Sequence, residues 1–249
     1  MASTQRIISL VPSLTELLFD LGLDTELVGL TKFCIHPADK VTGKTVVGGT
    51  KNVHLDRVAA LSPTLIIANK EENTRADIED LQSSFPVLLT DVITLDDALK
   101  MIITVGEDVD RQANARLLTN KISESFSDLE RHVQTRSSLP ARVAYLIWRD
   151  PWMVAGSQTF IDSMLTVSGF ANAFASQLRY PVVSPADLQT ADPDVIMLSS
   201  EPYPFSEKHL TELSEICPRA KLMLVDGELF SWYGSRLLHS AAYFKTLSD

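Results

Sequence analysis

The chain has 249 residues, of which 45% are hydrophobic, and its formal net charge is −10. This length can bury a core in each of two small lobes of about 100 residues. A phosphate-binding surface needs clustered Lys and Arg, and no such run occurs, so we expect no nucleic-acid partner. No apolar stretch approaches the roughly 18 residues that suggest a membrane-spanning helix.

The first six residues bear on the compartment. They lead straight into a strand-like run, without a basic region, an apolar region and a small-residue cleavage site. Two readings stay open: a periplasmic or cell-surface protein whose signal segment was removed, or a cytoplasmic protein. Cys34 and Cys217 do not make a disulfide framework and are read as free thiols.

Strands and helices alternate along the first half. Short apolar runs predict the strands, and one-sided runs predict the helices. Ser13 or Thr15 is expected to cap the first helix. The predicted strands are 6–11, 27–30, 46–47, 63–68 and 87–89, and the predicted helices are 16–21, 55–61, 74–82 and 94–106.

The second half follows the same plan. The predicted strands are 142–147, 193–198 and 221–225, and the predicted helices are 160–167, 185–188 and 206–216. A last helix is expected from Tyr233 or Ser235 to residue 247. Such alternation is typical of an α/β fold with parallel sheets.

The two halves also repeat in detail. Pro63 and Pro193 open matching strands 130 positions apart, and Glu71 and Glu201 are separated by the same 130 positions. Arg6 and Arg142 open the two halves. The shared proline and the shared glutamate favour two duplicated units over a chance likeness of two strands.

A different segment joins the halves. From residue 108 to about 136, apolar residues recur at helical spacing on one side, which predicts a helix on the order of 40 Å long. The run 137–140 then breaks it with Ser-Ser-Leu-Pro. We therefore expect an N-terminal lobe at 1–106, a linking backbone helix at 107–138, and a C-terminal lobe at 139–249.

These features resemble a known family. The run RIISLVPSLTE at 6–16, the run LSPTLII at 61–67 and the long middle helix are similar to the helical-backbone substrate-binding proteins of ABC importers. Within that group the chain is most similar to the cobalamin-binding members, whose relatives bind ferric siderophores and haem. The resemblance implies two Rossmann-like lobes joined by one backbone helix, a ligand cleft between the lobes, and a monomer that delivers its ligand to a membrane permease and ATPase complex.

The resemblance also gives the glutamates a role. In this family one carboxylate on each lobe docks onto arginines of the permease, and the matching positions here are Glu71, or its neighbour Glu72, and Glu201. Glu228 remains an alternative in the second lobe. Well-separated surface charges suit the registration of a transient partner. A catalytic pair is not expected, because the repeat puts the carboxylates on different lobes.

The pocket should form from loops at the carboxyl ends of the parallel strands. All three tryptophans of the chain fall in these loops. Grouped aromatics suit a large, flat and partly apolar ligand such as a corrin ring. The candidate ligand-binding residues are Ser13, Phe33, His36, Asn69, Trp148, Trp152, Tyr180, Trp232 and Tyr233.

His36 has two possible roles. Its imidazole could be an axial ligand of cobalt or iron, or it could contact the ligand without binding metal. In the cobalamin-binding relatives this loop carries an aromatic side chain that faces the ligand, and His36 stands at that place. Cys34 and His36 alone are too few ligands for a zinc site. No resident cofactor is expected, although the ligand may itself be a cobalt corrinoid or an iron chelate.

The charges bear on the choice of ligand. Lys32, Lys70, Arg149 and Arg179 are scattered, whereas an anionic catecholate siderophore would need convergent arginines. A corrinoid is therefore favoured, with a ferric siderophore or haem as the alternative. A cytosolic ligand-binding sensor without a transporter is the third hypothesis. An enzyme is not expected, because the sequence has no phosphate loop, nucleophile elbow or zinc-protease motif.

Overall fold

The computed structural model describes residues 5–137 and 139–248. The chain divides into two compact units. Unit 1 comprises Met1–Val92, Asp96–Asn120 and Trp232–Arg236, and unit 2 comprises Ile93–Leu95, Lys121–Ser231 and Leu237–Asp249. The expectation about an export signal falls largely on residues 1–4, which lie outside the described residues.

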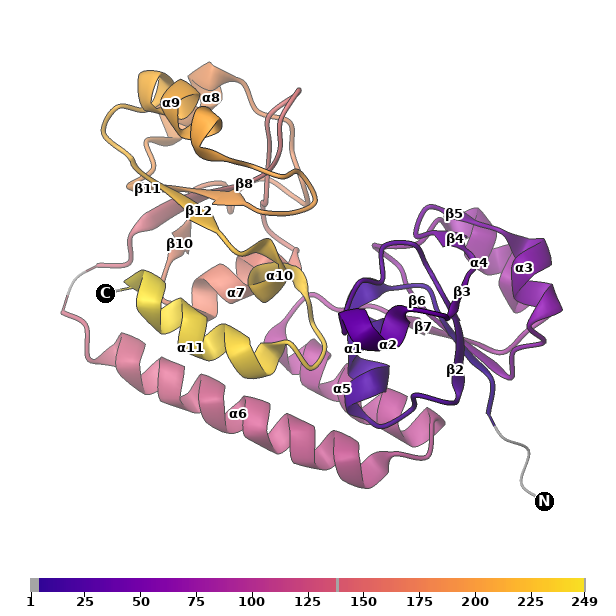
Figure 1. Cartoon of the computed structure of the whole chain (residues 1–249). Coiled ribbons are helices and arrows are strands. Elements are labelled where there is room, and N and C mark those ends of the chain that lie inside the picture. The colour runs from indigo at the N-terminus through magenta and orange to yellow at the C-terminus, as the bar shows by residue number, and fades with distance from the viewer. Residues whose placement is uncertain (1–4, 138, 249) are drawn as a thin grey trace. The chain divides into compact units, whose positions relative to one another are not determined.

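Unit 1 is built on a parallel sheet with the strand order β3-β2-β1-β6-β7 (Figure 1). The strands are short and mostly apolar, as the sequence predicts, although β3 is exposed and begins one residue before its predicted start. The strands are β1 (Ile7–Ser9), β2 (Leu27–Leu30), β3 (Thr45–Val46), β6 (Leu65–Asn69) and β7 (Val87–Thr90). The helices are α1 (Pro12–Asp20), α2 (Ala38–Val41), α3 (Leu55–Ala60), α4 (Arg75–Gln82) and α5 (Leu95–Asp108), and β4 (Gly48–Gly49) pairs with β5 (Asn52–Val53) in a small antiparallel hairpin.

Alternation along the strands divides the core of unit 1 between two faces. Ile8 and Ile66 belong to the buried cluster that packs under α3 and α4. By the same alternation Ser9 and Ile67 face the other side. Helix α1 lies on that side (Figure 1). The Thr15 hydroxyl of α1 donates to the Ser9 hydroxyl at 2.8 Å. Both faces are thus covered, which is the arrangement that parallel sheets require.

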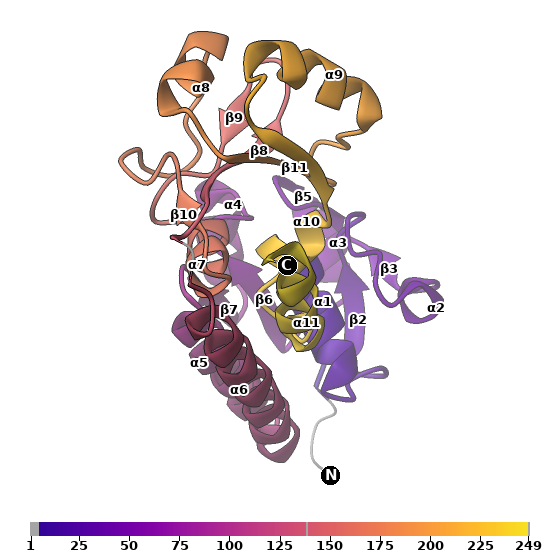
Figure 2. The same cartoon turned by 90° about the vertical axis from the view of Figure 1, so that its left-hand side faces the viewer.

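Unit 2 repeats the plan with the strand order β10-β8-β11-β12, and β9 pairs antiparallel with β8. Helices α8 and α9 lie on one face of this sheet and α7 and α10 on the other (Figures 1 and 2). The strands are β8 (Arg142–Trp148), β9 (Met153–Val154), β10 (Ala171–Asn172), β11 (Val195–Ser199) and β12 (Lys221–Val225). The helices are α7 (Phe160–Val167), α8 (Pro185–Ala191), α9 (Glu207–Ile216), α10 (Gly227–Ser231) and α11 (Leu237–Ser248).

The repeat read from the sequence is present in the backbone. Strands β6 and β11 each have five residues, and each begins two positions after its proline. The residue before each proline has a positive φ, 45° at Ser62 and 43° at Asp192. These two residues are also 130 positions apart. The same local turn therefore starts the same strand in both units.

The two arginines anchor these turns in the same way. The Arg6 backbone N–H donates to the Thr64 side chain at 2.9 Å, and its guanidinium donates to the Leu61 carbonyl at 2.8 Å. In unit 2 the Arg142 backbone N–H donates to Asp194 at 2.7 Å, and its guanidinium donates to the Ala191 carbonyl at 2.9 Å. The acceptors again lie 130 positions apart. Each arginine thus links the start of β1 or β8 to the turn that precedes the neighbouring strand in the sheet, β6 or β11.

Three of the predicted helices begin more than one residue away from their predicted starts, and α8 runs on to Ala191. Helix α1 begins at Pro12 after Val11, without a side-chain cap, because proline at the first helical position presets the backbone. The middle helix α6 (Gln112–Gln134) is shorter than predicted, because Asp110 adopts a positive φ of 54° and separates it from α5. The last helix, α11, begins at Leu237 rather than at 233 or 235, and the residues before it, Trp232–Arg236, group with unit 1.

Helix α6 contributes residues to both units, to unit 1 as far as Asn120 and to unit 2 from Lys121. In unit 2 it lies beside α11, where the rings of Phe126 and Phe244 are 6.4 Å apart (Figure 1). The boundaries predicted for the lobes and linker stay a prediction. Two short segments group apart from the lobes predicted for them: Ile93–Leu95 with unit 2 and Trp232–Arg236 with unit 1.

Candidate functional site

The loop after β2 carries the most exposed candidate of unit 1. Phe33 is 50% exposed, and the Lys32 Nζ lies 4.9 Å from the centre of its ring. His36 follows in the same loop, is partly exposed, and precedes Pro37 across a cis peptide bond. The imidazole of His36 packs edge-on against Trp232, with ring centroids 5.5 Å apart.

Cys34 is the buried residue of this loop, and its thiol contacts two hydroxyl groups. The Thr15 hydroxyl oxygen lies 3.0 Å from its Sγ, and the Thr31 hydroxyl oxygen lies 3.2 Å from the same atom. Burial raises the pKa of the Cys34 thiol, so it stays protonated and unreactive near neutral pH. Cys34 is therefore a packing residue that fixes its more exposed neighbours.

Residues Trp232 and Tyr233 are buried, with 6% and 5% of their surface exposed. They belong to a short segment, Trp232–Arg236, which we call the strap. Gly234 of the strap lies so close to α1 that a Cβ there would be 2.6 Å from the Ser13 carbonyl oxygen. Ser13 itself is 4% exposed. The strap thus covers the start of α1 within unit 1.

Asn69, at the end of β6, is 2% exposed. Its amide nitrogen donates to the Thr90 carbonyl and hydroxyl at 3.2 and 3.1 Å. Its Oδ1 accepts from the backbone N–H groups of Glu71 and Glu72 at 2.8 and 3.3 Å. Both ends of the amide are engaged, so the structure gives Asn69 a part in shaping the loop of the two glutamates.

The glutamates follow their strands in matching loops. In unit 1 the side chain at the end of β6 accepts from the Glu71 N–H, and in unit 2 the Ser199 hydroxyl accepts from the Glu201 N–H at 3.4 Å. Glu71, Glu72 and Glu201 are all partly exposed. The Ser231 hydroxyl donates to the carboxylate of Glu201.

In unit 2 the tryptophans differ in exposure. Trp148, at the end of β8, is 40% exposed, and Tyr203 packs edge-on against it at 5.6 Å. Trp152 is only 6% exposed and lies parallel to Phe205 at 6.1 Å, while the Arg149 guanidinium covers its ring at 4.6 Å. Trp152 therefore sits in the core of unit 2, and Trp148 presents aromatic surface.

Tyr180 lies in a loop that is held firmly by backbone hydrogen bonds. The loop is fastened at Gly156, whose N–H donates to the Arg179 carbonyl at 2.7 Å. Leu178 and Val182 on either side of Tyr180 are 62% and 60% exposed. The sequence did not point to Leu178, Val182 or Tyr203 as candidate ligand-binding residues, because isolated apolar residues in a loop give no periodic signal.

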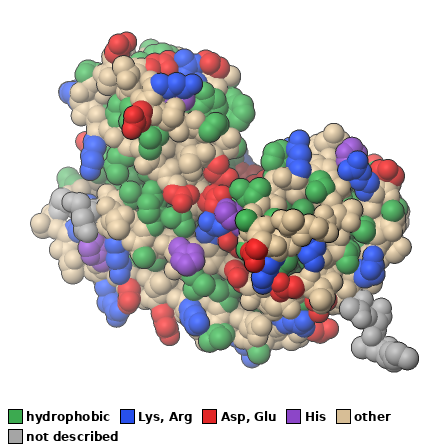
Figure 3. All heavy atoms as spheres, viewed as in Figure 1, with side chains coloured by type: hydrophobic (Ala, Val, Ile, Leu, Met, Phe, Trp, Pro, Cys, Tyr) green, Lys and Arg blue, Asp and Glu red, His purple; other side chains and the backbone are tan. Residues whose placement is uncertain are grey.

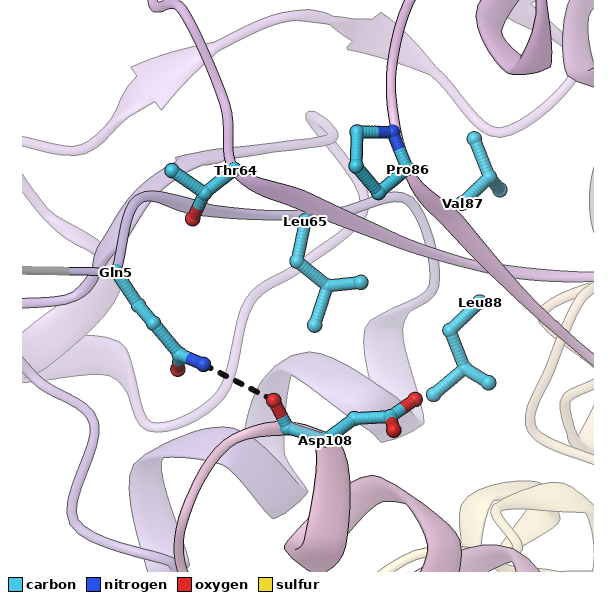
Figure 4. Close-up of a pocket in the computed structure, with 7 residues that line it drawn as sticks. All are labelled: Gln5, Thr64, Leu65, Pro86, Val87, Leu88 and Asp108. Atoms are coloured by element: carbon cyan, nitrogen blue, oxygen red, sulfur yellow. Dashed lines mark hydrogen bonds between the residues drawn. The ribbon is translucent and has the colours of Figure 1, made fainter. Parts of the chain in front are cut away.

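A cavity of about 470 Å³ opens at the amino ends of the strands of the unit 1 sheet (Figure 4). Its lining includes Leu65 and Val87, the first residues of β6 and β7, and the Gln5 amide donates to the Asp108 carbonyl at 3.0 Å across it. Ligands of open α/β sheets bind at the carboxyl ends of the strands, whereas this cavity lies at the amino ends. We therefore do not assign it to the ligand.

The charged and metal-binding side chains limit which ligands the site could take. On the face drawn in Figure 3, the Lys and Arg side chains are spread out and interspersed with acidic ones. Among the described residues, no group of three or more His, Cys, Asp or Glu side chains could hold a metal ion. Within the same residues, no helix is both long and apolar enough to cross a membrane. A metal contact by His36 would therefore need the remaining ligands to come from the bound molecule.

Residues 7–216 match the family model described as periplasmic binding protein. The chain belongs to this family. Over 245 residues it is 24% identical to the vitamin B12-binding protein of Pectobacterium carotovorum, covering 96% of this chain and 87% of the relative. It is also 28% identical over 199 residues to the uncharacterized ABC transporter substrate-binding lipoprotein YvrC of Bacillus subtilis, covering 78% of this chain and 63% of that protein.

The fold matches solved members of the family. The periplasmic haem-binding protein BhuT, solved with two haems, superposes with a TM-score of 0.86 at 22% identity and covers 98% of this chain and 97% of its own. This periplasmic binding protein is thus of the ABC-importer type, a substrate-binding transport protein and not an enzyme. It is similar in sequence to a B12 binder and shares its fold with a haem binder.

Proposed function

We propose that this periplasmic binding protein captures a cobalamin-like corrinoid and delivers it to the permease and ATPase complex of an ABC importer. The observation that carries the proposal is an exposed aromatic ring at the carboxyl ends of the strands in each unit, Phe33 in unit 1 and Trp148 in unit 2. A corrin has broad apolar faces for such rings to cover. The relative from Pectobacterium, named as a vitamin B12-binding protein, supports the same class of ligand.

The remaining candidates divide by their surroundings. His36 and Tyr180 are partly exposed in carboxyl-edge loops and stay in the proposed site. Ser13, Asn69, Trp152, Trp232 and Tyr233 are buried, so we propose that they support the contacting residues from behind. Glu71 or Glu72 and Glu201 are proposed to dock onto the permease.

Haem is the second candidate ligand, because the partly exposed imidazole of His36 is a suitable axial donor for iron. A family member of closely similar fold, BhuT, is described with two haems. A ferric catecholate siderophore is less well supported, because it would call for convergent arginines. We further propose a periplasmic or cell-surface location and a monomeric state, as expected of a delivery protein. A cytosolic sensor would bind its ligand without docking to a transporter.

The test is a titration of the purified protein with cyanocobalamin, haemin and a ferric catecholate, followed by absorbance and calorimetry. We expect saturable binding of cyanocobalamin with a change in the corrin absorption bands. Trp148→Ala should weaken binding about fivefold, because about 1 kcal/mol of stacking is lost. Leu139→Ala, at a residue 91% exposed, is the matched control and should change nothing. Heat with haemin or the catecholate but none with cyanocobalamin would refute the corrinoid assignment.

A further inference from the structure

The strap places a buried ring between two polar groups in unit 1. Trp232 is 6% exposed, so its faces are not available as a stacking surface for a large ligand. On one side the His36 imidazole meets it edge-on, with centroids 5.5 Å apart. On its face the Arg236 guanidinium lies 4.7 Å from the ring centre. Trp232 therefore contacts the candidate ligand-binding residue His36 on one side and stacks with the Arg236 guanidinium on its face.

Arg236 is fixed in turn by Glu16 of α1. Its Nε donates to one carboxylate oxygen of Glu16 at 2.9 Å, and its Nη2 donates to the other at 2.6 Å. The two side chains are only 15% and 16% exposed, so water screens the pair weakly. A planar guanidinium can stack on an indole and bind a carboxylate through two parallel bonds at once, whereas a lysine cannot.

The residues at both ends of this chain of contacts, Glu16 and His36, lie next to buried or hydrogen-bonded parts of unit 1. Glu16 lies in α1 between Thr15 and Leu17, which are both fully buried. Gly234 allows the strap to approach the Ser13 carbonyl, where a larger residue would collide. At the other end the loop of His36 is fastened two residues earlier, where the Cys34 N–H donates to the Thr31 carbonyl at 3.0 Å.

We infer that Glu16 and Arg236 are positioning residues that act through Trp232 to fix the imidazole of His36. His36 would then meet its ligand in one orientation, without the cost of ordering a mobile side chain on binding. The effect on ligand affinity rests on the proposed function, whereas the effect on His36 itself does not. The strap comes from the second half of the sequence, so the candidate site of unit 1 depends on residues about 200 positions beyond His36.

The first experiment uses the full-length protein without ligand. The edge contact with an indole displaces the imidazole C–H resonances of His36 through its ring current, and His36→Gln identifies them among the five histidines of the chain. In Arg236→Lys and in Glu16→Gln these resonances should move toward the values of an unstacked histidine. Arg75→Lys, in an exposed pair with Glu79, is the control and should leave them in place. Unchanged His36 resonances in both folded variants would overturn the proposal.

The second experiment measures affinity for two probes, cyanocobalamin and haemin. Arg236→Lys should weaken binding about tenfold in the wild-type protein and have no further effect in His36→Ala, because its influence passes through that imidazole. An equal loss in both backgrounds would overturn the positioning role, since Arg236 would then act elsewhere. Displaced His36 resonances in a protein that binds neither probe would refute the proposed ligand class while supporting the positioning role.

Discussion

Single residues of one type take different roles in this molecule, according to what packs around them. The three tryptophans all follow strand ends in the sequence, yet Trp148 is 40% exposed and Trp152 and Trp232 only 6%. Trp152 is covered by Phe205 and Arg149, and Trp232 by His36 and Arg236. From this difference in exposure we propose ligand contact for Trp148 and support for the other two.

Tyr145 offers a residue-scale prediction on pH. Full burial in the sheet of unit 2 raises the pKa of its phenol far above the usual value near 10, although Ser199 accepts its hydrogen bond. The folded protein keeps the proton while the unfolded chain loses it, so stability should fall as the pH rises above about 10. Chemical denaturation across alkaline pH should show this decline, and Tyr145→Phe should flatten it. An equally steep decline in the variant would contradict the assignment.

At the scale of elements, the repeat is carried by turns as well as by strands. The residues with positive φ before β6 and β11, and the arginines that bond to the turns beside them, occupy matching places in the two units. These contacts set where each strand begins and hence where it ends. Since Glu71 and Glu201 follow two residues after their strands, the turn at the start of a strand also places the carboxylate at its end.

The contact between α5 and α6 gives an element-scale prediction. A Cβ on Gly106 would lie 2.3 Å from the Cβ of Ala115, so the two helices meet too closely for a methyl group on both. Gly106→Ala should destabilise the protein by about 1–3 kcal/mol through overpacking, despite the better helix propensity of alanine.

Moving the methyl group across the contact is the control. In the double variant Gly106→Ala with Ala115→Gly, the collision is gone and the helix propensities balance, so stability should return to within about 1 kcal/mol of the wild type. Urea denaturation of the three proteins measures both effects. A double variant less stable than Gly106→Ala alone would show that the contact is not the cause.

At the scale of the whole molecule, each unit carries its own sheet and, at the carboxyl edge of that sheet, its own aromatic ring and its own glutamate loop. This duplication supports the proposal that each unit presents similar features to a ligand and to a transporter. The strap is the departure from a simple duplication, because a segment late in the sequence completes unit 1.

The docking proposal is tested at this scale. Glu71→Gln with Glu72→Gln, and separately Glu201→Gln, should leave cyanocobalamin affinity within about twofold, because we propose that these carboxylates dock onto the permease and do not contact the ligand. The stimulation of ATP hydrolysis by the permease and ATPase complex in lipid nanodiscs should fall about tenfold, because charge complementarity with the permease is lost. Glu124→Gln on α6 is the exposed control. A loss of cyanocobalamin affinity instead would place the glutamates in the ligand site.

The sequence by itself determined the α/β class, the order of the main strands along the chain, and the correspondence of Glu71 and Glu201 as matching positions. These depend on apolar runs, prolines and spacing, which are local properties of a chain. It could not determine which candidate side chains are exposed, because burial depends on partners distant in sequence, such as Phe205 over Trp152. Only the tertiary structure showed that residues 232–236 fold onto α1 and place Trp232 between His36 and Arg236.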